Sequence, residues 1–239
     1  MRIEVEKTLR AHEIAKKTDL FYTPKVLNYN DTTGCIKFER LDHIRKMRSV
    51  ITSMEIDDSI IRSLGFSLAA IHNELTLPDD MVLPLPQEYS QSGNQVFIHG
   101  DFNLGNIFLD MDNKRIIIMD WQSTYKVGEP ATYDTRYFDL MWFIYNLFYR
   151  PLNHPRYRSG IPAASMAELF LYSYFKRADC EYDHKSFSAY MKKFFNTKVA
   201  ISKIGHHSKK RFRLIPRKRY LQLMPSHRKL KQFISSFQL

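Results

Sequence analysis

Apolar positions along the chain recur with two different periods, which predict the order of helices and strands. Residues 7–17 and 57–76 carry apolar side chains at every third or fourth position, which is typical of amphipathic helices. Between them, residues 26–41 hold two short apolar runs around an Asn-Asp-Thr-Thr-Gly turn, which predicts a β-hairpin. Further helices, aromatic and apolar, are expected at about 136–149, 163–178 and 184–196.

A second hairpin is predicted near the middle of the chain, directly after a polar loop. Residues 98–106 run Ile-His-Gly-Asp-Phe-Asn-Leu-Gly-Asn, and this composition suits an irregular loop. Residues 107–109 form an apolar run, and after the turn residues 111–114 a second strand is expected at 115–119, which is apolar from residue 116 onward. The pattern therefore predicts loop, strand, turn and strand in that order.

Three polar side chains are expected to meet where this loop and hairpin join. Asp101 and Asn106 lie in the loop, and Asp120 follows the second strand. Oxygen ligands on a short hairpin suit Mg²⁺, which binds few protein carboxylates and keeps room for water and phosphate. With His99, they match the kinase spacing His-x-Asp-x-x-x-x-Asn followed by a metal-binding Asp. The alternative is a buried loop whose Asp and Asn only cap turns.

The variant His-Gly-Asp-x-x-x-x-Asn-Ile, with Asp-Trp in place of Asp-Phe-Gly, resembles the aminoglycoside phosphotransferase and choline kinase-like family. The resemblance covers roughly residues 7–150. It implies an α+β, protein kinase-like two-lobed fold with a truncated small β lobe and a mostly helical large lobe. The expected units are a partial small lobe at 1–41, a helical large lobe with the catalytic loop at 42–196, and a basic C-terminal helical tail at 197–239.

The same resemblance implies roles for the motif residues. Asp101 would accept the proton of the attacking hydroxyl and orient it, while Asn106 and Asp120 would hold Mg²⁺ on the β- and γ-phosphates of ATP. His99 would brace the loop by hydrogen bonds. Asp139 matches the aspartate that anchors the loop from below in the family, a structural role.

Nucleotide contacts are implied on both lobes. The segment at 39–41 resembles the one that joins the lobes and holds the adenine edge through its backbone, and two hairpin residues would form the apolar floor under adenine. A glutamate of the first helix matches the partner of the ATP-binding lysine, although an exposed helix carboxylate is the other interpretation of it. These expected nucleotide-binding residues are Glu39, Arg40, Leu41, Phe108, Met119 and Glu13.

The front of the family's small lobe has no match in the printed chain. Phosphate-binding loops need glycine, because only a residue without Cβ lets backbone N–H groups approach so closely, and the first glycine is Gly34. Lys7 stands too close to Glu13 to be the strand lysine. A start site placed too late, a real truncation and a divergent pseudokinase are the three interpretations.

Charge divides the chain into two parts. Residues 184–239 hold 15 of the 36 Lys and Arg and no acidic residue, so the part before them has 21 basic against 25 acidic residues. The tail interleaves this charge with apolar residues, which suits an anionic membrane surface, a nucleic acid, or a helix packed on the large lobe with a solvated basic face. Nucleic acid is the least favoured of the three.

Other features of the composition fit an intracellular protein. The two cysteines, Cys35 and Cys180, form no disulfide framework and are expected to be reduced. The N-terminus carries no apolar signal segment, and the longest apolar run, near residues 140–148, is too short to span a bilayer. We therefore predict a cytoplasmic protein without a transmembrane segment, in peripheral contact with the membrane if the tail binds lipid.

The function predicted from these features is ATP- and Mg²⁺-dependent transfer of a phosphoryl group to a hydroxyl of a small molecule, with a sugar or glycan precursor as one candidate acceptor. The nearly neutral body argues mildly against a cationic aminoglycoside, whose sites are commonly acidic. The alternative is a non-catalytic kinase-like binding module or pseudokinase that uses its basic tail to bind an anionic partner.

Overall fold

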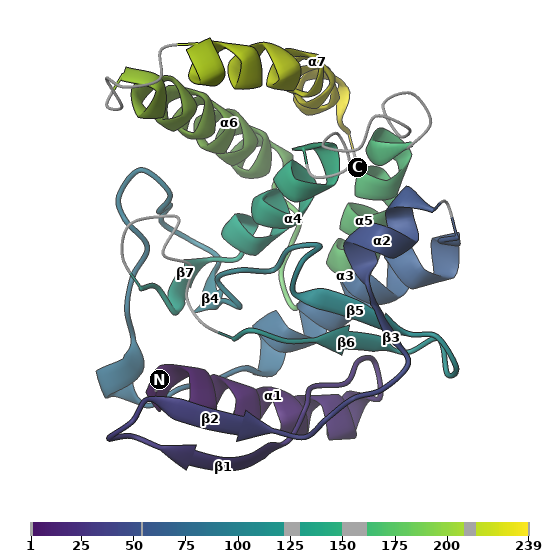
Figure 1. Cartoon of the computed structure of the whole chain (residues 1–239). Coiled ribbons are helices and arrows are strands. Elements are labelled where there is room, and N and C mark those ends of the chain that lie inside the picture. The colour runs from purple at the N-terminus through teal and green to yellow at the C-terminus, as the bar shows by residue number, and fades with distance from the viewer. Residues whose placement is uncertain (1, 54, 122–129, 150–161, 208–213, 239) are drawn as a thin grey trace.

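The computed structural model describes residues 2–53, 55–121, 130–149, 162–207 and 214–238, without the side chains of residues 202–207 and 214–222 (Figure 1). The described elements follow in the order α1 (Arg2–Thr18), β1 (Val26–Asn30), β2 (Cys35–Phe38), β3 (Ile44–Lys46), α2 (Met47–Thr52), α3 (Asp58–Glu74), η1 (Asp79–Met81), β4 (Gln95–Phe97), β5 (Ile107–Asp110), β6 (Ile116–Ile118), β7 (Tyr133–Thr135), α4 (Tyr137–Tyr149), α5 (Ala163–Arg177), α6 (His184–His207) and α7 (Leu214–Ser236).

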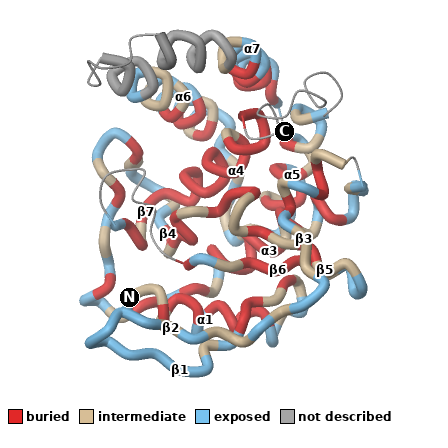
Figure 2. Tube along the Cα trace, viewed as in Figure 1, coloured by how far each residue is buried: buried red, intermediate tan, exposed pale blue. Residues whose placement is uncertain are grey.

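Helix α1 and the β1–β2 hairpin form one end of the molecule, at the bottom of Figure 1. The hairpin is antiparallel and closes with Asn30 opposite Cys35. Its strands are mostly exposed, as the pale blue of Figure 2 shows, while one face of α1 is buried. The helix, rather than the hairpin, therefore makes the close contact with the rest of the chain.

A three-stranded antiparallel sheet in the order β3-β5-β6 lies next to this end. The loop of residues 98–106 leads directly into its middle strand, β5. The segment after α1 joins the sheet, because the Tyr22 N–H donates to the Ile116 carbonyl at 2.7 Å and the Ile118 N–H donates to the Tyr22 carbonyl at 2.9 Å. These two hydrogen bonds connect the chain that follows α1 directly to β6.

The helices pack most closely where a glycine permits it. A Cβ on Gly65 of α3 would lie 2.5 Å from the Phe170 carbonyl oxygen of α5, so only glycine lets these helices approach so closely. Helix α4 lies in the middle of the helical part, and 12 of its 13 residues are buried (Figure 2). An apolar sequence of this kind forms a central helix because no face of it needs solvent.

The described part of the tail packs on the large lobe. The apolar residues Leu230, Phe233, Ile234 and Phe237 are each at most 5% exposed, and α7 contacts α4 and α6. The basic residues between them are exposed, as a packed helix with a solvated basic face requires. Lys209, Lys210 and Arg211 of the tail lie outside the described residues.

The α+β, protein kinase-like fold class predicted from the sequence is confirmed by these elements and by the structural match given below. Asp57 caps α3, since its carboxylate accepts from the Ile60 N–H at 3.1 Å. The sequence pattern missed the short strands β3, β4 and β7 and the short helix α2, and it ended α6 about ten residues early. No described helix has both the length and the apolar character needed to cross a bilayer.

Candidate active site

A buried carboxylate holds the loop that carries the motif. One oxygen of Asp139, in the first turn of α4, accepts the His99 N–H at 2.7 Å, and the other accepts the Gly100 N–H at 2.9 Å. Gly100 has a φ of +85°, a conformation that L side chains rarely adopt, so the bend at this point favours glycine. The fully buried Asp139 therefore fixes the backbone just before Asp101.

His72, at the end of α3, supplies a third donor to the same carboxylate. Its Nε2 lies 3.0 Å from Asp139 Oδ2, and its Nδ1 lies 2.7 Å from the hydroxyl of Tyr174. Burial lowers the pKa of His72, so the ring is neutral near pH 7. Because the carboxylate only accepts, Nε2 carries the proton and Nδ1 accepts from Tyr174. Burial tends to raise the pKa of Asp139, but the hydrogen bond from His72 and the nearby Lys7 keep it below its usual value.

Lys7 of α1 supports the same loop from the small-lobe side. Its side chain is fully buried, and Nζ donates to the His99 carbonyl at 2.6 Å. Burial lowers the pKa of Lys7 from 10.5 to about 8, against the opposing attraction of Asp139, Asp120 and Asp101. This single contact ties α1 to a loop 92 residues further along the chain.

His99 is held as a neutral ring inside this arrangement. Burial, aided by the positive charge of Lys7, lowers the pKa of His99 to about 3. Its Nδ1 accepts the Asp101 N–H at 3.2 Å, so the proton of the neutral ring is on Nε2. The ring also packs on the indole of Trp121, with 4.5 Å between ring centroids. The His99 ring thus supports the loop backbone at Asp101 and packs against the residue that follows Asp120.

Asp101 follows Gly100 in the loop, and its two carboxylate oxygens have different partners. Oδ2 accepts from the Asn106 side-chain amide at 2.9 Å, and Oδ1 accepts from the indole N–H of Trp142 at 2.7 Å. The buried Asn103 closes the loop by donating to the Asp101 carbonyl at 3.0 Å and accepting from the Gly105 N–H at 2.7 Å. The half-buried Asp101 carboxylate is therefore fixed in orientation.

Asp120 differs from Asp101 in exposure and in backbone geometry. It is exposed, and its φ of +60° lies in the left-handed region, which is uncommon for a residue with a side chain. The residue before it, Met119, donates its N–H to the Asn106 carbonyl at 2.9 Å. That hydrogen bond joins the end of the loop to the end of β6, which brings Asn106 and Asp120 into one neighbourhood.

The chemistry of Asn106 and Asp120 fits Mg²⁺. The Asn106 amide nitrogen faces Asp101, so the amide oxygen is directed away from that carboxylate. An amide oxygen and an exposed carboxylate are hard oxygen donors, and Mg²⁺ commonly takes only one or two protein ligands and completes its coordination with phosphates and water. Within the part of the chain that the structure describes, no group of three His, Cys, Asp or Glu could hold a metal ion by itself.

The expected nucleotide residues are placed at several points. Phe108 of β5 and Met119 after β6 are both partly exposed on the hairpin that follows the loop. The Glu39 N–H donates to the Lys25 carbonyl at 3.0 Å, so the Glu39 carbonyl, together with the backbone of Arg40 and Leu41, is left for the expected adenine contact. The guanidinium of Arg40 is exposed and pairs with Asp42.

Glu13 is not brought to the site. Its side chain is 72% exposed and pairs with Lys16 on the same helix at 3.2 Å. The buried face of α1 carries Lys7, Ala11 and Ile14, which are spaced at i, i+4 and i+7, and Glu13 projects from another face. The residue that α1 directs toward the loop of residues 98–106 is Lys7.

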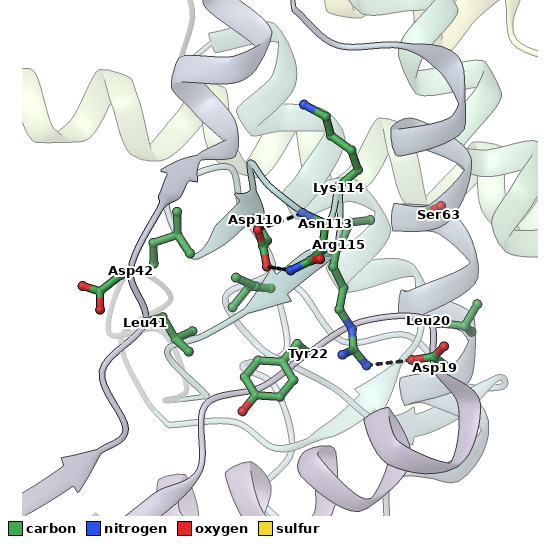
Figure 3. A pocket seen from close by; sticks show the side chains of 13 residues that line it. Asp19, Leu20, Tyr22, Leu41, Asp42, Ser63, Asp110, Asn113, Lys114 and Arg115 are labelled. Atoms are coloured by element: carbon green, nitrogen blue, oxygen red, sulfur yellow. Dashed lines mark hydrogen bonds and ion pairs between the residues drawn. The ribbon is translucent and has the colours of Figure 1, made fainter.

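A pocket of about 620 Å³ lies at the turn end of the β5–β6 hairpin (Figure 3). Its walls include Leu41 and the turn between β5 and β6, where Arg115 pairs with Asp19 at 2.8 Å. None of Asp101, Asn106 and Asp120 lines it. Leu41 of the lobe-joining segment therefore borders this pocket.

Sequence reasoning missed several residues that complete the site. Lys7 had a visible signal, because it is a lysine on the apolar stripe of a predicted helix. Trp142 also had one, since it follows Asp139 by three residues and so shares its helix face. The contribution of His72 had no local signal, because its partner lies 67 residues away in the sequence.

Comparisons with known proteins agree with this geometry. Residues 74–168, which contain the loop and the hairpin, match the model of the phosphotransferase enzyme family. Among solved structures, the chain is similar to a choline/ethanolamine kinase family protein from Mesorhizobium loti, with 14% identity, a TM-score of 0.56, and coverage of 99% of this chain and 80% of that one. No curated protein matches the chain.

These findings confirm the resemblance to the aminoglycoside phosphotransferase and choline kinase-like family that the motif residues indicated. The family match supports a phosphotransferase that acts on a small molecule, and the structural match supports the protein kinase-like fold. ATP and Mg²⁺ are the cofactors typical of such enzymes.

Proposed function

We propose that the chain transfers the γ-phosphoryl group of ATP to a hydroxyl of a small acceptor such as a sugar or glycan precursor, with Mg²⁺ as cofactor. The observation that carries the proposal is the setting of Asp101. Its backbone is fixed by Asp139 from below, and its carboxylate is oriented by Asn106 and Trp142. A half-buried carboxylate with this support suits a proton acceptor that must face an incoming hydroxyl.

In the proposed reaction, the hydroxyl oxygen of the acceptor attacks the γ-phosphorus of ATP, and Asp101 accepts the hydroxyl proton. The bond between the γ-phosphorus and the bridging oxygen breaks, and ADP leaves with that oxygen. Asn106 and Asp120 are the proposed metal ligands, and bound Mg²⁺ would neutralise charge on the phosphates. His99 stays neutral at working pH, since its pKa is about 3, so it braces the loop and takes no proton from the acceptor.

Adenine binding is proposed at the hairpin and the lobe-joining segment. Phe108 and Met119 are the proposed floor, and the backbone of Glu39, Arg40 and Leu41 is the proposed edge contact. The hydrogen bond from the Met119 N–H to the Asn106 carbonyl supports the floor, because it couples that residue to a proposed metal ligand.

The rival function is a kinase-like binding module that performs no transfer. The orientation of Asp101 by two separate donors argues against it, because a scaffold has no need to fix a partly exposed carboxylate.

We also propose that the chain binds peripherally to an anionic membrane, through its basic side chains and without inserting apolar ones. The exposed face of α7 carries Arg228, Lys229 and Lys231, while the apolar residues of the same segment are packed inward. Such contact gains about 1 kcal/mol per basic residue near the surface and is screened by salt. Vesicle co-sedimentation of wild type against a variant with these three residues changed to Gln tests it.

The experiment that tests transfer is a screen of hydroxylated metabolites with ATP, with and without Mg²⁺. We expect a Mg²⁺-dependent phosphomonoester on at least one acceptor, detected by its mass. Nucleotide binding without any phosphorylated acceptor, across a panel of sugars, amino alcohols and aminoglycosides, would favour the binding module instead.

A further inference from the structure

Three aromatic rings beside Asp101 enclose a lysine ammonium of the same chain. Lys198 Nζ lies 4.1 Å from the ring centroid of Trp142, 4.7 Å from that of Tyr89 and 5.4 Å from that of Phe194. The rings come from α4, from the loop between η1 and β4, and from α6. We call these three rings the aromatic cage. A cation over several ring faces is stabilised by their quadrupoles, so this position holds positive charge.

Trp142 connects the cage to the proposed catalytic residue. The edge of its indole donates to Asp101 Oδ1 at 2.7 Å, while its ring carries the ammonium of Lys198. One side chain therefore stands between the proposed proton acceptor and a positive charge. The Asp101 carboxylate and the Lys198 ammonium both contact this one indole, so the two groups lie close enough together for one small acceptor to meet both.

The cage is held in place before any acceptor arrives. Asp134 of β7 accepts from the backbone N–H groups of Leu85 and Gln91, which fixes the loop on both sides of Tyr89. The hydroxyl of Tyr190 in α6 donates to the Tyr89 carbonyl at 2.8 Å. Tyr89 and Phe194 are fully buried, so neither ring has to be ordered when an acceptor binds.

We propose that Lys198 is the charge-recognition residue of the acceptor site, and that the acceptor carries an anionic group, a carboxylate or a phosphate, in addition to the hydroxyl. The inference rests on the proposed function and adds the substrate class to it. An ammonium already in the cage repels a cationic acceptor and leaves it no aromatic surface to occupy, whereas it attracts an anion.

The test compares acceptors that share one sugar and differ in charge. Glucose, glucuronate, glucose 6-phosphate and glucosamine are each assayed for binding by calorimetry and for phosphorylation with ATP and Mg²⁺. The proteins are wild type, Lys198→Gln, and Lys192→Gln as the control, because Lys192 is an exposed lysine on the same helix. Glucuronate and glucose 6-phosphate separate a carboxylate preference from a phosphate preference.

We expect wild type and Lys192→Gln to bind at least one anionic sugar about tenfold more tightly than glucose, as for a hydrogen bond to a charged group, and glucosamine most weakly. Lys198→Gln should bind the anionic sugars and glucose alike. A preference unchanged in Lys198→Gln, a preference for glucosamine, or no binding of any of the four sugars would overturn the inference. Binding with the expected preference but no transfer would contradict the proposed function and leave the inference standing.

Discussion

The loop of residues 98–106 has two sides that differ in how completely their polar groups are enclosed. Below it, Asp139, His72 and Lys7 are almost fully buried, and each is hydrogen-bonded to the loop or to another residue of this group. On the open side, Asp101 is half-buried and Asp120 is exposed in a left-handed conformation. We call the first group the loop floor.

This difference separates two physical tasks. The loop floor resists movement, because removing one partner of a buried polar group leaves another without compensation. The open side needs access to phosphate, metal and acceptor, so its groups retain contact with water. Substitutions in the floor should therefore act on stability, whereas substitutions on the open side should act on binding and turnover.

Asp139→Asn is expected to have the largest effect on stability. The amide cannot accept all three hydrogen bonds that the carboxylate receives from His99, Gly100 and His72, so the free energy of unfolding should fall by about 3 kcal/mol or more. Urea denaturation at pH 7 measures this, with the exposed Asp112→Asn as the control. A loss near zero would mean that the floor does not hold the fold.

Lys7→Met should change how stability depends on pH. Lys7 has a pKa of about 8 in the folded chain and 10.5 when unfolded, so between these values the unfolded chain binds more protons and the free energy of unfolding rises with pH. Between pH 8 and pH 10, Lys7 should raise the free energy of unfolding of the wild-type protein by about 2 kcal/mol, and Lys7→Met should lack this rise.

The measurement is urea denaturation of wild type and Lys7→Met at several pH values in that window. Lys16→Met serves as the control, because Lys16 is exposed on the same helix. If the free energy of unfolding changes with pH in the same way in wild type and Lys7→Met, Lys7 keeps its proton in the folded chain throughout this pH range. Burial would then not lower its pKa as described.

Asp120→Ala tests the open side of the loop. Its effect on the free energy of unfolding should be smaller than that of either substitution in the floor. The substitution should weaken Mg²⁺-dependent ATP binding by at least about tenfold, as changes around metal sites commonly do, with little change in stability. Calorimetry with and without Mg²⁺ measures this difference. Equal weakening in both conditions would assign Asp120 a structural role.

The sequence predicted the open side better than the floor. Asp101, Asn106 and Asp120 share one short stretch, so their spacing predicts their proximity and no tertiary information is needed. Residues 2–18, 58–74 and 137–149 each supply one member of the floor, and only the fold brings those three helices together. The family resemblance had placed Asp139 below the loop, whereas the parts played by Lys7 and His72 were not predicted.

Elsewhere in the fold, too, elements with a local sequence pattern were predicted and elements formed by distant contacts were not. Helices α3, α4 and α5, each with a clear apolar period, were predicted within two residues of their bounds. Strands β4 and β7 have three residues each and pair with each other across 38 positions, so no local period marks them. Trp142 and Lys198 meet only because α6 packs beside α4.

The most direct test of the central claim is Asp101→Asn, assayed at once for turnover of a phosphorylated acceptor, ATP affinity and stability. The amide keeps the size of the side chain and removes the proton acceptor, so turnover should fall by about 10²-fold or more. Mg²⁺-dependent ATP affinity and the free energy of unfolding should stay near the wild-type values. Turnover close to wild type in this folded variant would remove Asp101 from the reaction and contradict the account.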